Sequence, residues 1–186
     1  MTVAPERYAS TVSMMEPVFP LYLRGLGITP GRIGLVYGAA AVGTTLLHPL
    51  YGHAADRWGA RQMTTLGMLL AGCVLPFVSR VQSFPSAIAL GVLSAACSSM
   101  AITPSLAFMG EATSNAGVGS FGVAYGLYNL AWGAGLLGGP AAGGFLFERL
   151  GFTNLLLLWG AMLIVVAICL SRLQLSPAKA GHYERT

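Results

Sequence analysis

The chain has little charge. Asp, Glu, Lys and Arg make up 9% of its 186 residues, and Lys179 is its single lysine. An ordinary soluble domain carries about 25% charged residues, so this chain could not cover a water-facing surface. The shortage excludes a soluble globular enzyme, a disordered tail and a coiled coil. Hydrophobic residues make up 55% of the chain, which indicates an integral membrane protein.

Several kinds of functional cluster are missing as well. Cys73, Cys97 and Cys169 all lie inside apolar runs, so they are predicted to be small core residues and not a disulfide framework or a metal site. No stretch combines clustered Lys and Arg with aromatic residues, so no nucleic-acid partner is expected. The sequence has no Ser/His protease arrangement and no phosphate loop. We therefore expect no enzyme activity, no cofactor and no metal ion.

Long apolar runs divide the sequence. Charge-free stretches cover 33–55, 62–79, 81–110, 112–147 and 150–171. A helix that crosses a membrane needs roughly 20 predominantly apolar residues, so each run predicts one such helix. A weaker candidate precedes them and contains Glu16, Pro17 and Pro20. Proline is tolerated in a membrane helix when neighbours satisfy the freed carbonyl groups.

The predicted fold class is all-α, a polytopic membrane protein with six transmembrane helices. The unit covers residues 1–172, and a polar tail follows at 173–186. The helices are predicted at about 8–26, 31–55, 62–79, 84–110, 117–147 and 152–171.

The distribution of basic residues predicts an orientation. With six helices both termini lie on one side, which carries six Lys and Arg against four on the opposite side. Cytoplasmic loops carry an excess of these residues, so the count favours both termini in the cytoplasm. We expect a multi-pass protein of the cell membrane, with a vesicle membrane as the open alternative.

A short link between the second and third predicted helices, residues 52–61, has the sequence GHAADRWGAR. Asp56 is expected to cap the next helix, whose free N–H groups favour a carboxylate. Arg57 and Arg61 can anchor to lipid headgroups or pair with acids on neighbouring helices. An ordinary basic loop is the alternative. The link resembles the signature loop of the major facilitator superfamily, G-x-L-A-D-R-x-G-R-K. The matching residues are Gly52, Ala55, Asp56, Arg57, Gly59 and Arg61.

The fifth predicted helix contains regularly spaced glycines. Gly135, Gly139 and Gly143 recur every four residues and form one smooth face, against which another helix can pack closely. A generic seam of small residues is the alternative. The full pattern, G-x8-G-x3-G-P-x2-G-G, resembles the antiporter motif of drug:proton antiporters in the same superfamily. It comprises Gly126, Gly135, Gly139, Pro140, Gly143 and Gly144.

Glu16 is an acidic residue inside the first predicted helix. A charge at the centre of a membrane costs roughly 2.5–3.5 kcal/mol on insertion scales, so Glu16 is a candidate for proton uptake and release. The alternative is that the helix begins later and Glu16 lies near the interface. His48 could line a cavity. Four aromatic residues could form a wall around an organic cation: Tyr37, Tyr125, Tyr128 and Trp132.

The segment around Glu16, together with the glycine pattern, resembles the C-terminal half of a vesicular amine transporter or of its bacterial drug-exporter relatives. The resemblance covers about residues 12–172. It implies half of a major facilitator fold, two inverted three-helix repeats whose first, second, fourth and fifth helices face a cavity. The third and sixth helices would then face lipid. Ser99 and Asn129 occupy positions where family members often carry acids, which leaves Glu16 as the only intramembrane carboxylate.

The function that the resemblance implies is transport of a small organic solute, drug-like or amine-like, by proton antiport. The expected partners are membrane lipid, the solute, protons and a second six-helix half, as a separate chain or a second copy. The alternative is a truncated, non-transporting fragment or an assembly module of a split transporter. The candidate proton and substrate residues are Glu16, Asn129, His48, Ser99 and Tyr125.

Overall fold

The computed structural model describes residues 4–115 and 121–172, and these residues form five helices without a strand. The all-α class is therefore confirmed, while the predicted tail at 173–186 lies outside the described residues. The helices are α1 (Ala4–Gly25), α2 (Pro30–Trp58), α3 (Ala60–Val78), α4 (Phe84–Asn115) and α5 (Phe121–Arg172).

Proline and glycine set two of the helix boundaries. α2 begins with Pro30, whose fixed φ and missing N–H suit the first position of a helix. α2 ends before Gly59, which has φ 93°, a conformation that glycine adopts without the steric cost of a Cβ atom. α3 begins at the next residue, so a single glycine reverses the chain between the two helices.

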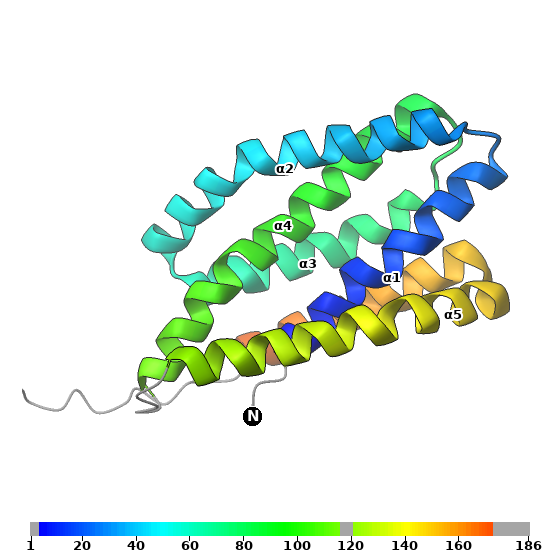
Figure 1. The fold of residues 1–186 in the computed structure, drawn as a ribbon. Helices are drawn as coiled ribbons and strands as arrows, with labels where there is room; N and C mark the ends of the chain where they lie inside the picture. Colours follow the sequence, from blue (N-terminus) through cyan, green and yellow to red (C-terminus); the bar gives the residue numbers. More distant parts are fainter. Residues whose placement is uncertain (1–3, 116–120, 173–186) are drawn as a thin grey trace, which may run out of the picture.

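The last two predicted helices, 117–147 and 152–171, form a single element. α5 runs for 52 residues, but Gly151 has φ 73° and ψ 168°, and two helical segments meet there. Figure 1 shows α5 turning back on itself, with its second segment returning beside the first. The described residues thus form five helices where six were predicted, because one glycine makes the whole turn. We refer to 121–150 and 152–172 as the first and second segments of α5.

The helices pack in an elongated bundle. α1 packs along α5, α3 packs against both α4 and α5, and α2 packs mainly against α4. Figure 1 shows α2 and α5 at opposite edges of the bundle, with α3 and α4 between them. The third helix was expected to face lipid, and this stays a prediction, since α3 exposes Leu66, Leu70 and Phe77. Nine residues of α3 are buried, because it lies between two partners.

The outer faces of the bundle suit a membrane. Among the described residues, four segments are long and apolar enough to cross one, and large side chains such as Leu46 (71% exposed) and Leu137 (83% exposed) point outward. Cys73 and Cys169 are exposed on α3 and α5, so the prediction of core positions is wrong for these two cysteines, while Cys97 is half-buried. The four segments are Pro30–Trp58, Ala60–Val78, Phe84–Ser105 and Tyr128–Arg172.

Tyr22 fixes the end of α1 against the rest of the bundle. Its hydroxyl donates to the backbone oxygens of Val81 (2.9 Å) and Ser79 (3.1 Å), after α3 ends. Its ring stacks on Phe152 of α5, with the centroids 3.9 Å apart. These contacts hold in place the helix that carries Glu16, about one and a half turns earlier in α1.

Candidate functional site

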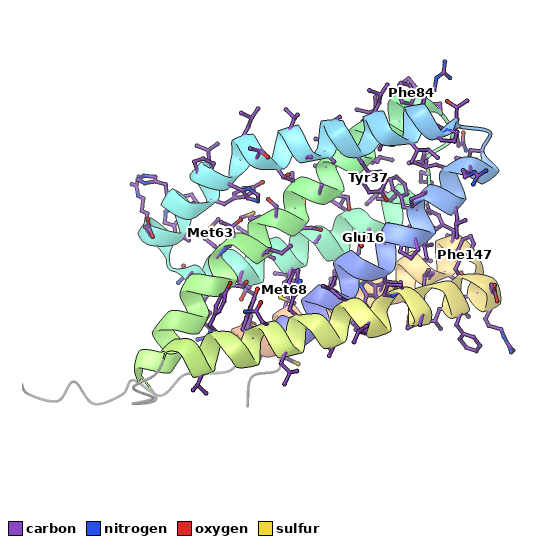
Figure 2. The ribbon with its side chains drawn as sticks, viewed as in Figure 1. Glu16, Tyr37, Met63, Met68, Phe84 and Phe147 are labelled. Carbon is purple, nitrogen blue, oxygen red and sulfur yellow. The ribbon has the colours of Figure 1, made fainter. Side chains whose placement is uncertain are left out.

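A hollow of about 490 Å³ lies between α1, α2, α3 and α4, and we call it the Glu16 hollow. Its walls are mostly apolar and include Phe19 and Leu75, and Glu16 is the only charged residue among the described residues that line it. Figure 2 shows Glu16 and Tyr37 close together on α1 and α2. The polar lining residues are Glu16, Tyr37, Thr44, Ser94 and Ser98.

A proline explains why Tyr37 lies beside Glu16. Pro20 has no N–H, so the carbonyl oxygen of Glu16, four residues earlier, loses its donor in the helix. The Tyr37 hydroxyl donates to this oxygen over a long distance of 3.5 Å. A freed carbonyl inside a membrane needs a new donor. Pro20 therefore leaves a backbone oxygen to which Tyr37 of α2 donates, and this contact places Tyr37 beside Glu16.

The Glu16 hollow offers a limited set of chemical groups. The carboxyl group of Glu16 and four hydroxyls provide oxygen acceptors, while the rings of Phe19 and Tyr37, 6.3 Å apart, provide aromatic faces. Ligand pockets span about 300–1,000 Å³ and combine apolar walls with a few polar groups. A carboxylate beside aromatic rings attracts a positively charged group. The hollow thus suits a small organic cation.

The predicted signature loop forms the turn between α2 and α3. The N–H of Gly59 donates to the backbone oxygen of Ala55 at 2.8 Å. The prediction that Asp56 caps the next helix is wrong, because α2 continues to Trp58 and holds Asp56 in its last turn. The N-cap of α3 is Gly59, which has no side chain, so α3 begins without a side-chain hydrogen bond. Asp56 and Arg57 are exposed, and Gly52 is half-buried.

Arg61 joins this turn to the far end of the chain. Its guanidinium group donates to the backbone oxygens of Leu170 (2.6 Å) and Ser171 (3.1 Å). These oxygens belong to the last turn of α5, where carbonyls lack helix donors and carry the negative end of the helix dipole. The sequence suggested headgroups or acids as partners of Arg61, and the structure adds backbone carbonyls more than 100 residues away.

Three glycines of the predicted antiporter motif are buried at four-residue spacing on α5, and one of them, Gly143, lies against α1. Gly135, Gly139 and Gly143 are buried, and a Cβ atom at Gly143 would overlap the side chain of Met14 in α1. The motif also includes positions away from this contact, since a Cβ atom at Gly126 or Gly144 would meet nothing within 4 Å. α5 continues as a helix through Pro140.

Comparison with known protein families identifies the superfamily of the chain. The family model of the Major Facilitator Superfamily matches residues 8–185, which include Glu16, the turn at Gly59 and the glycine face. The chain belongs to the Major Facilitator Superfamily. Members of this superfamily are integral membrane transporters, which agrees with the apolar outer faces of the bundle.

Three relatives illustrate what the chain is similar to. The chain is 28% identical to a Multi-drug resistance efflux pump PmrA homolog of Lactococcus lactis subsp. lactis, over 86% of this chain and 39% of the relative. It is 26% identical to the human MFS-type transporter SLC18B1, over 77% of this chain and 34% of the relative. It is 25% identical to the human Chromaffin granule amine transporter, over 90% of this chain and 32% of the relative. The chain therefore spans only 32% to 39% of the length of these relatives.

The other candidate residues of this Major Facilitator Superfamily chain do not line the Glu16 hollow. Ser99 is buried, 6% exposed, and its hydroxyl has no hydrogen-bond partner within the described structure. His48 is exposed on α2. Asn129 is exposed on α5, and its side-chain amide donates to the backbone oxygen of Tyr125 at 2.9 Å. The predicted aromatic wall is divided, because Tyr37 lines the hollow while Tyr125 lies on α5.

Three hydroxyl residues of the hollow, Thr44, Ser94 and Ser98, were missed in the sequence. Tyr37 and Thr44 are seven residues apart on α2, and Ser94 and Ser98 are four apart on α4. Both spacings place side chains on one face of a helix, so a search for polar pairs at helical spacing would have found them. Serine and threonine are common in apolar helices, however, and their frequency hid this signal.

A close approach between α3 and α5 was missed too. A Cβ atom at Gly160 would lie 2.6 Å from the backbone oxygen of Gly72, and one at Gly72 would lie 2.8 Å from that of Gly160. Pro76 has no N–H, so the oxygen of Gly72 also lacks its helix donor. The two glycines let the helices cross in backbone contact, and no motif in the sequence pairs them.

Proposed function

We propose that the chain forms one six-helix half of a transporter that exchanges small organic solutes, drug-like or amine-like, for protons. α1 to α4 and the two segments of α5 supply six membrane crossings in this proposal. The observation that carries it is the Glu16 hollow, in which a lone carboxyl group lies among hydroxyls and aromatic rings. The names of the relatives, a drug efflux pump and an amine transporter, support the same solute class.

Exchange follows from the properties of one carboxyl group. Ionised Glu16 attracts a cationic solute, and the rings of Phe19 and Tyr37 contact its charged group. When Glu16 takes up a proton, the charge that held the solute is lost and the solute leaves. A carboxyl group that holds either a proton or a cation couples the two movements in opposite directions. The hydroxyls of Thr44, Ser94 and Ser98 would orient the solute.

The proposal includes a second six-helix half. Substrate sites of such transporters lie between two repeats or bundles near the middle of the membrane. α2 and the first segment of α5 expose side chains such as Leu46, Tyr125 and Leu130, which supports a face available to another bundle. That bundle is a separate chain or a second copy. We place the protein in the cell membrane with both termini in the cytoplasm, because basic residues are more frequent on that side.

Uptake by lipid vesicles that contain the purified chain tests the proposal. We expect a fluorescent organic cation such as ethidium to accumulate when a pH gradient is imposed, with Glu16→Gln removing the dependence on the gradient. The matched control is Glu148→Gln, which makes the same change at an exposed position outside the hollow. Uptake that keeps its pH dependence in Glu16→Gln would exclude Glu16 from coupling. Uptake no greater than in empty vesicles would favour the alternative, a fragment that does not transport by itself.

A further inference from the structure

A second hollow, also about 490 Å³, lies where α2 turns into α3 and α5 ends, and we call it the turn groove. At the turn its lining includes the polar side chains of Arg61, Gln62 and Ser171 beside Trp58. Further along α3 the lining becomes apolar at Leu66 and Leu69. The turn groove is separate from the Glu16 hollow, because no residue lines both.

The order of these groups along α3 matches an amphiphile. α3 rises 1.5 Å per residue, so Leu69 lies about 12 Å deeper along the helix than Arg61. Leu66 is 43% exposed and Trp58 is 58% exposed, so both present apolar surface to their surroundings. Tryptophan is enriched where the hydrocarbon of a membrane meets the headgroups. With α3 crossing the membrane, the turn groove would run from the headgroup level into the hydrocarbon.

The polar end of the turn groove carries positive charge. Arg57 and Arg172 are exposed, and each is next in sequence to a lining residue, Trp58 or Ser171. Arg61 is held at the groove by its bonds to the end of α5. Asp56 is the one acid in the two flanking helix ends, and α3 starts without an acid in its first turn. Three arginines against one aspartate give this end a net charge of about +2, which favours an anionic headgroup.

We propose that the turn groove binds an anionic phospholipid from the adjoining leaflet. Its phosphate lies at the rim formed by Arg57, Arg172 and the start of α3, and one acyl chain lies along Leu66 and Leu69. The lipid would brace the same junction that Arg61 bridges, between the turn after α2 and the end of α5. This site does not depend on the Glu16 hollow or on the transport proposed there.

The test measures which lipid lies next to Trp58. Replacing Trp132 and Trp159 by phenylalanine leaves Trp58 as the only tryptophan of the chain. This chain is placed in phosphatidylcholine vesicles that contain a fraction of phosphatidylglycerol brominated in its acyl chains, which quenches the fluorescence of a nearby tryptophan. The quenching of Trp58 is compared with that in vesicles where brominated phosphatidylcholine makes up the same fraction. We expect stronger quenching by phosphatidylglycerol. The double variant Arg57→Gln/Arg172→Gln should reduce this preference by up to about 30-fold, since each basic residue contributes about 1 kcal/mol near an anionic surface.

Two further variants make the result specific. Arg80→Gln/Arg149→Gln removes the same charge at the other end of the bundle and should keep the preference, and Arg57→Lys/Arg172→Lys retains charge at the groove and should keep most of it. Equal quenching by the two lipids in the parent chain would overturn the proposal. An equal loss of the preference for phosphatidylglycerol in both glutamine double variants would also overturn the proposal. It would indicate that the preference comes from the overall surface charge and not from the turn groove. Restoration of fluorescence by millimolar inorganic phosphate would assign the site to a free anion instead of a lipid.

Discussion

α2 and α3 follow one another in the chain and are both apolar enough to cross a membrane, yet the bundle uses them differently. α2 has 29 residues, of which Ile33, Val36 and Ala55 are its buried ones. α3 has 19 residues and buries nine of them. Hydrophobicity therefore shows that both helices lie in a membrane but does not show which one is surrounded by protein. Neighbouring helices decide that, since α3 contacts α4 and α5 on two sides while α2 packs mainly on α4.

Glycine has opposite consequences in the two helices. Gly67 and Gly72 of α3 lie against the backbone of α4 and α5. Gly34 and Gly38 of α2 have no atom within 4 Å of the position that a Cβ would take. Small residues permit close approach only where another helix is present. Gly67 and Gly72 of α3 are therefore packing residues, whereas Gly34 and Gly38 of α2 leave a smooth surface.

The largest effect expected from this comparison is that of Gly67→Ala in α3. The added Cβ atom would lie 2.5 Å from the backbone nitrogen of Ala101 in α4, so the two helices must separate. We expect a loss of about 3 kcal/mol in the free energy of unfolding, near the upper end for overpacking. Gly34→Ala in α2 is the matched control and should be neutral or slightly stabilising. Unfolding of the purified protein in detergent measures both, and equal effects would show that α3 is not more tightly packed.

Leu75→Ala and Leu46→Ala compare the same change at a buried and an exposed leucine. Leu75 of α3 is 2% exposed and Leu46 of α2 is 71% exposed. We expect Leu75→Ala to lower the free energy of unfolding by about 2 kcal/mol, because it leaves a cavity. That value lies at the low end of the range for Leu→Ala substitutions in protein cores, because apolar surroundings replace water around this helix. Leu46→Ala should cost less than about 0.5 kcal/mol. A similar loss in both variants would contradict the burial difference.

The smallest effect compares two arginines four residues apart. Arg61→Gln removes the charged bonds from α3 to the oxygens of Leu170 and Ser171. Because Arg61 is partly exposed, we expect a loss of only about 1 kcal/mol, below the usual range for bonds to charged groups. Arg57→Gln at the end of α2 should change the free energy of unfolding by less than about 0.5 kcal/mol. Unfolding in detergent measures both variants, and an unchanged Arg61→Gln protein would show that its bonds to α5 contribute no stability.

Several elements could be predicted because their signals are local. Predicted helices 31–55, 62–79 and 84–110 correspond to Pro30–Trp58, Ala60–Val78 and Phe84–Asn115. Glu16 was expected inside the first helix, and α1 contains it. The turn at Gly151 was expected as a loop, and it proved to be a single non-helical residue. Runs of about 20 apolar residues and glycine at a reversal each depend on a short stretch of chain.

The composition alone determined that this protein lies in a membrane, and the spaced motifs indicated its superfamily. The tertiary structure decided that Tyr37 donates to the carbonyl of Glu16, that Arg61 holds the end of α5, and that α3 is more buried than α2. It also left His48, Ser99 and Asn129 outside the Glu16 hollow. Each of these outcomes depends on which helices become neighbours. Helix contacts join residues far apart in sequence through packing in three dimensions, and no periodicity within a single helix specifies them.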